Sequence, residues 1–377
     1  MDAEQALNAA RDRITPLAVV DERCLGENIA RMARLASGAG IALRPHAKTH
    51  KSPTVGLRQV RGGAIGLTVA TLHEAEVFLD AGIDDLLLAH PPVGEVKLAR
   101  LAALADRARR VAVALDDVQV AARLPASVEV LWEVDTGQHR IGTGAGEATA
   151  AAVQRLVARI GVERFRGLAT HGGHAYGARN DSDRRQAAAD ERDGLTSSAR
   201  MIRELGIPVG TISVGSTPTA SFSPLLEGIT EMRPGTYVYG DANQVALGSQ
   251  ALEQCALGVV ATVVSTPDPD RAVLDAGSKA LSGDLRVAGL DGYGVVIGRP
   301  DLRLDRLSEE HGMLSAGGST RLAIGDRVVV IPAHACTTVN LHPRVLMFAG
   351  DGSSRWDPVL GRGWEATGTS PSGTPPG

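Results

Sequence analysis

Short apolar runs alternate with amphipathic helical stretches through the first two thirds of the chain, and this alternation restricts the fold more than any other feature. Nine runs have the length and composition of strands: Leu17–Val20, Ile41–Leu43, Ala64–Val69, Asp85–Ala89, Val111–Leu115, Val128–Val134, Phe165–Thr170, Thr211–Val214 and Tyr237–Tyr239. Helical patterns separate them, for example over Gly26–Ala36, Leu72–Asp80 and Ala187–Leu205. Strands separated by helices of this size predict right-handed βαβ units and a parallel sheet.

The number of these units predicts a (β/α)8 barrel, because about eight units in about 230 residues is typical of that fold. Nine strands are one too many. We therefore expect the first or the last run to be irregular or to belong to a neighbouring domain. The chain has 377 residues, of which 44% are apolar, and this length suggests one large domain and a smaller one.

The pattern changes after residue 245. Strand-like runs at Ala256–Ser265, Arg271–Asp275, Gly294–Ile297 and Asp326–Pro332 are separated by turns rather than by long helices, which predicts an all-β second domain. We expect the barrel over residues 14–245 and the β-domain over residues 246–365, together with part of the N-terminus. Residues 366–377 hold no apolar anchor and are expected to be disordered.

Composition argues against several classes of protein. The net charge of -4 and the aromatic content of 3% give neither the basic surface nor the stacking platforms of a nucleic-acid-binding protein. The sequence contains neither a membrane-length apolar stretch nor the apolar segment of a signal peptide. We therefore expect a cytoplasmic protein with no nucleic-acid or membrane partner. Cys24, Cys255 and Cys336 are too few for a disulfide framework.

Polar loops follow several predicted strands, at the end of the barrel where such folds carry their chemistry. The second strand leads into RPHAKTHK, which contains Lys48 and Lys51, and the sixth leads into DTGQHR, which ends at Arg140. The seventh leads into HGGHAY, which begins at His171 and ends at Tyr176.

Two further loops, GSTPT over residues 215–219 and RPGTY over residues 233–237, are rich in small and hydroxyl residues. Such loops present N–H groups and hydroxyls without bulky side chains, which is what a phosphate requires, although each alone resembles an ordinary turn. Together with the lysine loop they indicate a phosphorylated cofactor. A lysine beside a phosphate site is how pyridoxal phosphate enzymes hold their aldehyde as a Schiff base, which favours Lys48. For Lys51 the simpler expectation is a solvated loop charge.

The predicted β-domain carries a second polar cluster, PAHAC, which ends at Cys336. On a strand, residues two apart face the same side, so His334 and Cys336 could point at one ion. Imidazole and thiolate favour zinc over magnesium, and two protein ligands leave positions for water or substrate, as in a catalytic site. The alternative is a buried cysteine next to a hydrogen-bonded histidine.

The motifs together resemble a known family. RPHAKTHK, DTGQHRIG, THGGHAYG, SVGSTPT, EMRPGTYVYGD, DAGSKALS, EEHG and HACTTVN occur in this order and are similar to those of the D-threonine aldolase and D-serine dehydratase group. The resemblance spans roughly residues 14–350. It implies pyridoxal phosphate enzymes built like alanine racemase, with a barrel, a β-domain and a head-to-tail homodimer whose subunits both contribute to the site.

The resemblance also implies roles for individual residues. Lys48 matches the Schiff-base lysine, Arg140 matches the arginine that approaches the phenolic oxygen of the cofactor, and Tyr176 matches an active-site tyrosine. The phosphate cradle would comprise Gly215, Ser216, Thr217, Gly235, Thr236 and Tyr237. His334 and Cys336 match the metal pair, with zinc expected and manganese or magnesium as alternatives.

One departure inside the group bears on the reaction. Members that resemble D-threonine aldolases carry an aspartate where this chain has Cys336, and a cysteine there resembles the dehydratases. The resemblance therefore implies dehydration of a D-3-hydroxy amino acid, such as D-serine or D-threonine, to a 2-oxo acid and ammonia. The stretch TTVNL over residues 337–341 still resembles the aldolases, so cleavage to glycine and an aldehyde is the alternative.

The sequence does not decide which residues serve as general acid and general base. His171, His174 and His311 are candidate bases, each with structural hydrogen bonding as the alternative. A racemase, which is the less favoured activity, would need a second base on the opposite face of the cofactor. A non-catalytic carrier of the cofactor would need neither the β-domain nor the metal pair.

Overall fold

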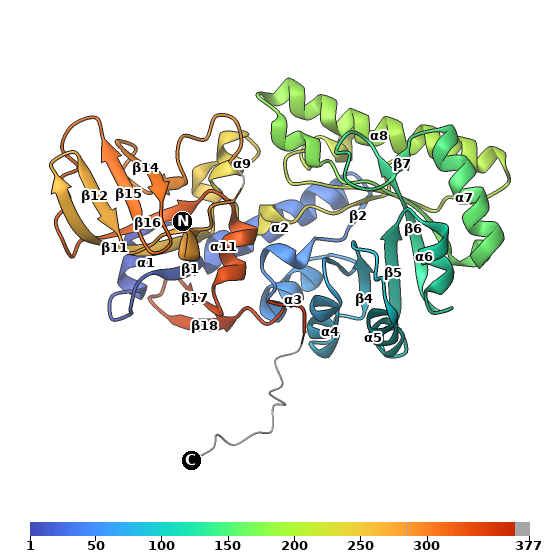
Figure 1. The fold of residues 1–377 in the computed structure, drawn as a ribbon, viewed down its shortest axis with the longest axis horizontal. Helices are drawn as coiled ribbons and strands as arrows, with labels where there is room; N and C mark the ends of the chain where they lie inside the picture. Colours follow the sequence, from blue (N-terminus) through green and yellow to red (C-terminus); the bar gives the residue numbers. More distant parts are fainter. Residues whose placement is uncertain (285, 366–377) are drawn as a thin grey trace, which may run out of the picture.

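The computed structural model describes residues 1–284 and 286–365 of the chain. Two sheets organise this part of the molecule, one parallel and one mostly antiparallel, and Figure 1 shows them in separate lobes. The structure therefore confirms the predicted fold class, a (β/α)8 barrel with an all-β domain. The expected disordered tail, residues 366–377, lies outside the described residues.

The parallel sheet forms the barrel. Its strands are ordered β2-β10-β9-β8-β6-β5-β4-β3. A parallel bridge between His46 and Thr68 and a hydrogen bond from the Ile65 N–H to the Leu43 carbonyl (2.9 Å) join the two ends of this order. The strands are β2 (Ala42–Leu43), β3 (Leu67–Val69), β4 (Asp85–Leu88), β5 (Arg110–Leu115), β6 (Glu129–Asp135), β8 (Phe165–Ala169), β9 (Thr211–Val214) and β10 (Glu231–Met232), with β7 (Thr143–Gly144) pairing only with β6.

Helices separate the strands, as Figure 1 shows for α3 to α8. The helices of this lobe are α2 (Glu22–Gly38), α3 (Pro53–Arg61), α4 (Leu72–Asp80), α5 (Glu95–Ala105), α6 (Val118–Arg123), α7 (Glu147–Ile160) and α8 (Asp181–Glu204). Several begin at residues with a strong capping preference. The side chains of Thr71, Asp117 and Asn180 accept backbone N–H groups at the starts of α4, α6 and α8, which satisfies otherwise unpaired donors.

Neither of the two runs in question, the first and the last, is a barrel strand. The first run forms β1 (Leu17–Asp21), which pairs with β11 and β17 of the antiparallel sheet. Tyr237–Tyr239 is not a strand, because Thr236–Val238 forms a 3₁₀ turn whose aromatic side chains are buried. The eighth barrel strand is β10, which has two residues and is too short to give a sequence pattern of its own.

Besides β1, the antiparallel lobe contains the four strands that the sequence predicted for it and four more. Its strands besides β1 are β11 (Leu257–Asp268), β12 (Arg271–Leu274), β13 (Gly294–Val296), β14 (Leu302–Leu307), β15 (Gly312–Ala316), β16 (Arg327–Pro332), β17 (Arg344–Phe348) and β18 (Ser354–Pro358). The described helices that lie with them are α1 (Ala3–Ala9), α9 (Ala242–Ala246), α10 (Ser278–Leu281) and α11 (Ala335–Leu341). β14 was missed because charged residues alternate with its three leucines, as expected of a half-exposed strand.

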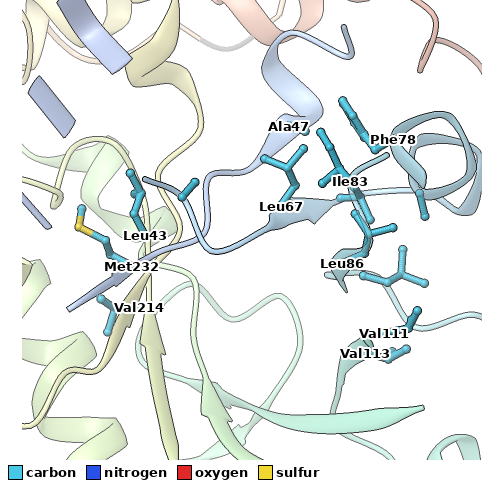
Figure 2. Close-up of a cluster of buried hydrophobic side chains, with 14 of the residues drawn as sticks. Leu43, Ala47, Leu67, Phe78, Ile83, Leu86, Val111, Val113, Val214 and Met232 are labelled. Carbon is cyan, nitrogen blue, oxygen red and sulfur yellow. The ribbon is translucent and has the colours of Figure 1, made fainter. Parts of the chain in front are cut away.

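The barrel strands bury different side chains on their two faces. Leu43, Val214 and Met232 are paired across β2, β9 and β10 and belong to the apolar cluster in Figure 2. On the other face the buried residues are partly charged. Arg44 donates to Asp85 (2.7 Å) and to Glu231 (2.9 Å). Buried ions of this kind have to be paired, so a polar network runs through the barrel below the site.

None of the helices within the described residues is long and apolar enough to cross a membrane.

Candidate active site

A cavity of about 370 Å³ lies where the carboxyl ends of the barrel strands meet the start of α11. Ten of its lining residues belong to the predicted site: Lys48, Arg140, His171, Tyr176, Ser216, Thr217, Gly235, Thr236, His334 and Cys336. His46, Gln138, Gly173, Arg233 and Thr337 complete the lining. A larger groove of about 630 Å³ between α2 and α3 is lined mainly by apolar side chains and arginines, without such a convergence of different functional groups.

Lys48 lies in a 3₁₀ turn, Ala47–Thr49, directly after β2. Burial lowers the pKa of its ammonium, and the positive charge of Arg140 lowers it further. A lower pKa leaves more of the amine unprotonated near neutral pH, and the unprotonated amine is the form that attacks a carbonyl or accepts a proton.

Lys51 is not a solvated loop charge, so the expectation for this residue was wrong. Its Nζ lies 3.0 Å from Oε1 of Glu74, and the two side chains are 13% and 0% exposed. The cause is tertiary. Lys51 has a left-handed backbone with φ of 51°, and its carbonyl accepts the N–H of Gly361 (2.9 Å). The C-terminal segment therefore packs against this lysine, which sequence spacing could not reveal.

Only one of the three candidate bases lines the cavity. His171 Nδ1 lies 2.7 Å from the carbonyl oxygen of Gly215, so Nδ1 carries a proton and Nε2 has a free lone pair. Burial and the neighbouring charge of Lys48 hold the pKa of His171 well below its usual value, which keeps the ring neutral. His174 lies outside the lining, and His311 lies in the exposed turn between β14 and β15.

The predicted phosphate loops contribute Ser216, Thr217, Gly235 and Thr236 to the lining. Gly235 has little room for a larger residue, since a Cβ there would lie 3.1 Å from both the His46 carbonyl oxygen and Thr49 Oγ1. Buried hydroxyls beside a crowded glycine are a suitable cradle for a phosphate.

Two predicted members of the cradle do not line the cavity. The N–H of Gly215 is already bonded to Glu191 (3.0 Å). The Tyr237 phenol accepts from Gln59 Nε2 (2.9 Å), and the Tyr237 N–H donates to Thr217 Oγ1 (3.1 Å). The roles of Gly215 and Tyr237 as direct cofactor contacts stay predictions. In the structure their hydrogen bonds stabilise the loops that carry the lining residues.

Tyr176 and Arg140 occupy different surroundings in the cavity. Burial raises the pKa of the Tyr176 phenol, so it remains protonated and can donate a hydrogen bond. Gln244 Nε2 lies 3.4 Å from its oxygen. Arg140 is exposed at the rim, in the loop that follows β6. A hydrogen bond from the Gly142 N–H to the Asp116 carboxylate (2.7 Å) stabilises this loop.

His334 and Cys336 are not on a strand, so that part of the prediction was wrong. β16 ends at Pro332, His334 is the N-cap of α11, and Cys336 lies in the first helical turn. The two side chains nevertheless lie close together, since both line the cavity and each shifts the pKa of the other. The Cys336 thiolate outweighs burial and raises the pKa of His334 to about 10, while His334 lowers the pKa of Cys336 despite burial.

The donors of this pair suit a metal ion of the zinc type. His334 Nδ1 lies 2.7 Å from a carboxylate oxygen of Asp284, and such a carboxylate commonly orients a ligating histidine through its other ring nitrogen. Within residues 1–284 and 286–365, no group of three or more potential ligand side chains is arranged to hold an ion. The pair by itself would leave coordination positions open.

Cys336 also connects the two lobes. Its sulfur lies 3.1 Å from Thr49 Oγ1 and 3.7 Å from Thr236 Oγ1. Thr49 follows Lys48 directly, so the lysine turn and the histidine–cysteine pair are in contact. The start of α11 therefore forms one wall of the cavity, against the loops of the barrel.

Two functional candidates were missed by reasoning from the sequence. Arg233 lines the cavity and donates to the Thr170 carbonyl (2.7 Å); its position directly after β10 is a signal that could have identified it. His46 also lines the cavity, and its Nδ1 lies 3.4 Å from the Lys48 N–H. Its place two residues before Lys48 could have drawn attention to it.

Two family models match the chain. The alanine racemase N-terminal domain matches residues 20–243, and the putative serine dehydratase domain matches residues 256–348. A D-threo-3-hydroxyaspartate dehydratase from Delftia sp. (strain HT23) is 36% identical over 371 residues, covering 92% of this chain and 97% of that protein. This chain belongs to the D-serine dehydratase and D-threonine aldolase family. The named relatives are dehydratases and aldolases, which makes the family one of lyases.

Other relatives include both activities of the family. A D-threonine aldolase from Arthrobacter sp. is 33% identical over 339 residues, covering 87% of each chain. A D-serine dehydratase from Dictyostelium discoideum is 28% identical over 361 residues, covering 86% of this chain and 90% of that protein.

Solved structures agree with these matches. The Delftia sp. HT23 dehydratase superposes with a TM-score of 0.87 at 35% identity, covering 97% of this chain and 100% of that one. D-threonine aldolase from Filomicrobium marinum gives a TM-score of 0.85 at 30% identity, covering 93% and 96%. Two structures are of dehydratase variants in which a histidine or a cysteine is replaced by alanine, and the cysteine variant is described as metal-free.

Proposed function

We propose that this chain is a pyridoxal phosphate- and metal-dependent dehydratase of D-3-hydroxy amino acids, which releases a 2-oxo acid and ammonia. One observation carries the proposal: a single cavity brings together a lysine of lowered pKa, a cradle of hydroxyls and glycine, and a histidine–cysteine pair. The names of the relatives, which include D-threo-3-hydroxyaspartate dehydratase and D-serine dehydratase, support it.

The residues of the cavity fit pyridoxal phosphate. Lys48 would hold its aldehyde, the hydroxyls of Ser216, Thr217 and Thr236 would bind its phosphate, and Arg140 would approach its phenolic oxygen. When bound, pyridoxal phosphate supplies an electron sink for the Cα of an amino acid.

The chain itself supplies the proton transfers. A neutral Lys48 Nζ can take the proton from the substrate Cα. Nε2 of His171 is an acceptor because Nδ1 is committed to Gly215, so it can hold or move a proton at the substrate hydroxyl. Tyr176, whose phenol stays protonated, can donate a hydrogen bond in the same cavity.

We further propose that His334 and Cys336 hold a divalent ion, for which zinc is the first choice and manganese or magnesium the alternatives. The ion would serve as a Lewis acid for departure of the substrate hydroxyl. Two substituted positions in the D-threo-3-hydroxyaspartate dehydratase variants, a histidine and a cysteine, are two residues apart, which is the spacing of this pair.

A homodimer is part of the proposal. Arg140 lines the cavity and is yet exposed, so one side of the site is open within a single chain. A second subunit placed across this rim would exclude water from the cavity. Sedimentation or light scattering of the purified protein tests the oligomeric state, and a stable monomer with full activity would contradict the dimer.

Aldol cleavage is the second candidate, because a D-threonine aldolase is 33% identical and its named activity also requires activation of a β-hydroxyl. Product analysis separates the two. D-serine, D-threonine, D-threo-3-hydroxyaspartate and the L-forms are each incubated with the protein. We expect 2-oxo acid and ammonia from the D-forms. Glycine and acetaldehyde as the main products from D-threonine would make the chain an aldolase.

A further inference from the structure

Glu191 is a buried acid that the proposed reaction does not use. It lies in α8, most of whose charged residues face solvent, yet its side chain is 0% exposed. Burial raises its pKa to about 7. A buried carboxyl costs free energy that an apolar side chain would not, so its presence calls for a function.

The contacts of Glu191 lead to the phosphate loops. Oε1 accepts the N–H of Gly215 at 3.0 Å, and the Thr219 hydroxyl also faces the carboxylate. Gly215 and Thr219 are the first and last residues of the turn whose Ser216 and Thr217 line the cavity. Ser216 and Thr219 are joined by a hydrogen bond of 3.0 Å between their hydroxyls. Glu191 therefore holds this turn from the side away from the cavity.

A second loop depends on the same carboxylate. Gly172 follows His171 and lies so close that a Cβ there would be 2.6 Å from Oε2 of Glu191. Any larger residue would push the loop and the carboxylate apart. Both backbone polar groups of Gly215 are hydrogen-bonded. Its carbonyl accepts from His171 Nδ1 (2.7 Å), and its N–H donates to Glu191.

We propose that Glu191 is a positioning residue which, by accepting the Gly215 N–H, sets the phosphate cradle and the orientation of His171. The inference rests on the proposed binding of pyridoxal phosphate. It predicts that loss of the acceptor at position 191 weakens binding of the phosphate more than binding of the ring. A residue that served only to fill the core would have no such selectivity.

The experiment compares pyridoxal phosphate with pyridoxal, which lacks the phosphate, as ligands of the full chain after removal of any bound cofactor. Glu191→Met keeps the length of the side chain and removes the acceptor. Glu191→Gln keeps an amide oxygen that can accept from Gly215. Glu204→Met is the matched control, because Glu204 ends the same helix and is exposed.

We expect Glu191→Met to raise the Kd for pyridoxal phosphate about tenfold, the effect of one lost buried hydrogen bond, and to leave the Kd for pyridoxal within about twofold of wild type. Glu191→Gln should retain most of the affinity, and Glu204→Met all of it. Wild-type affinity in Glu191→Met, or an equal loss for both ligands, would overturn the inference. So would a Glu191→Gln variant as weak as Glu191→Met.

Failure of the proposed function has a different outcome. If the wild-type chain bound neither ligand, the proposed function would be wrong and the inference about Glu191 would fall with it. If the wild-type chain binds pyridoxal phosphate and the variants show no phosphate selectivity, the proposed function stands and only the role of Glu191 is refuted.

Discussion

Lys48 and Lys51 are three residues apart, and the structure predicts opposite consequences for replacing them with methionine. Lys48 lines the cavity, whereas Lys51 pairs with the buried Glu74 at 3.0 Å. Methionine has nearly the length of lysine without its charge, so each substitution removes one ammonium and little packing. Lys48→Met should abolish the visible absorbance of the bound cofactor, and Lys51→Met should preserve it.

The stability changes should run the other way. Removing one partner of a buried ion pair costs about 3–5 kcal/mol, because the remaining charge is left unpaired. Glu74 keeps one contact, since its Oε2 still accepts the Ala70 N–H at 2.7 Å, so we expect the lower limit, about 3 kcal/mol. Burial disfavours the charged form of Lys48, so this ammonium adds little to stability. Replacing Lys48 should therefore change the free energy of unfolding by less than about 1 kcal/mol.

The assays are urea unfolding and absorbance spectra of the same preparations. Lys51→Met combined with Glu74→Gln is the control, because removing both charges should recover part of the lost stability. If Lys51→Met lost the visible absorbance while Lys48→Met kept it, the assignment of the cofactor lysine would be wrong. Unchanged unfolding of Lys51→Met would refute the reasoning about the buried pair.

The other predictions concern the metal pair, the base and the acid Glu191. A chelator should abolish 2-oxo acid formation and leave the visible absorbance in place; full dehydratase activity in metal-free protein would show that the pair is not catalytic. Cys336→Asp should lower dehydration and shift the metal preference from zinc toward manganese or magnesium, measured as activity with each metal restored; an unchanged preference contradicts this. His171→Asn should lower kcat by about a hundredfold or more without loss of cofactor absorbance, and a wild-type kcat would remove His171 from the mechanism. Because burial raises the pKa of Glu191 to about 7, its protonated form favours folding. Stability from this group should fall as pH rises from about 4.5 to about 7, by about 3 kcal/mol at most. Urea unfolding across this range should show the slope in wild type and lose it in Glu191→Gln.

The sequence alone predicted the fold class and most of the residues that line the cavity. Seven of its predicted strands are barrel strands, because the period of apolar residues is a local property that the chain displays directly. The loops after these strands identified Lys48, His171 and Ser216, since the carboxyl ends of parallel strands meet at one face of a barrel. The pairing of His334 with Cys336 also emerged from their spacing, although the strand assumed for it is a helix.

Only the tertiary structure decided the features that depend on contacts between distant segments. β1 has the pattern of a barrel strand, yet it pairs with β11, more than two hundred residues away in the chain. Lys51 is mostly shielded from solvent, next to the segment around Gly361, and Glu191 accepts the Gly215 N–H from the middle of a helix with no motif around it. Local patterns report which face of an element is apolar. They carry no information about which remote segment satisfies a charge or an N–H group, because the packing of the whole chain fixes those partners.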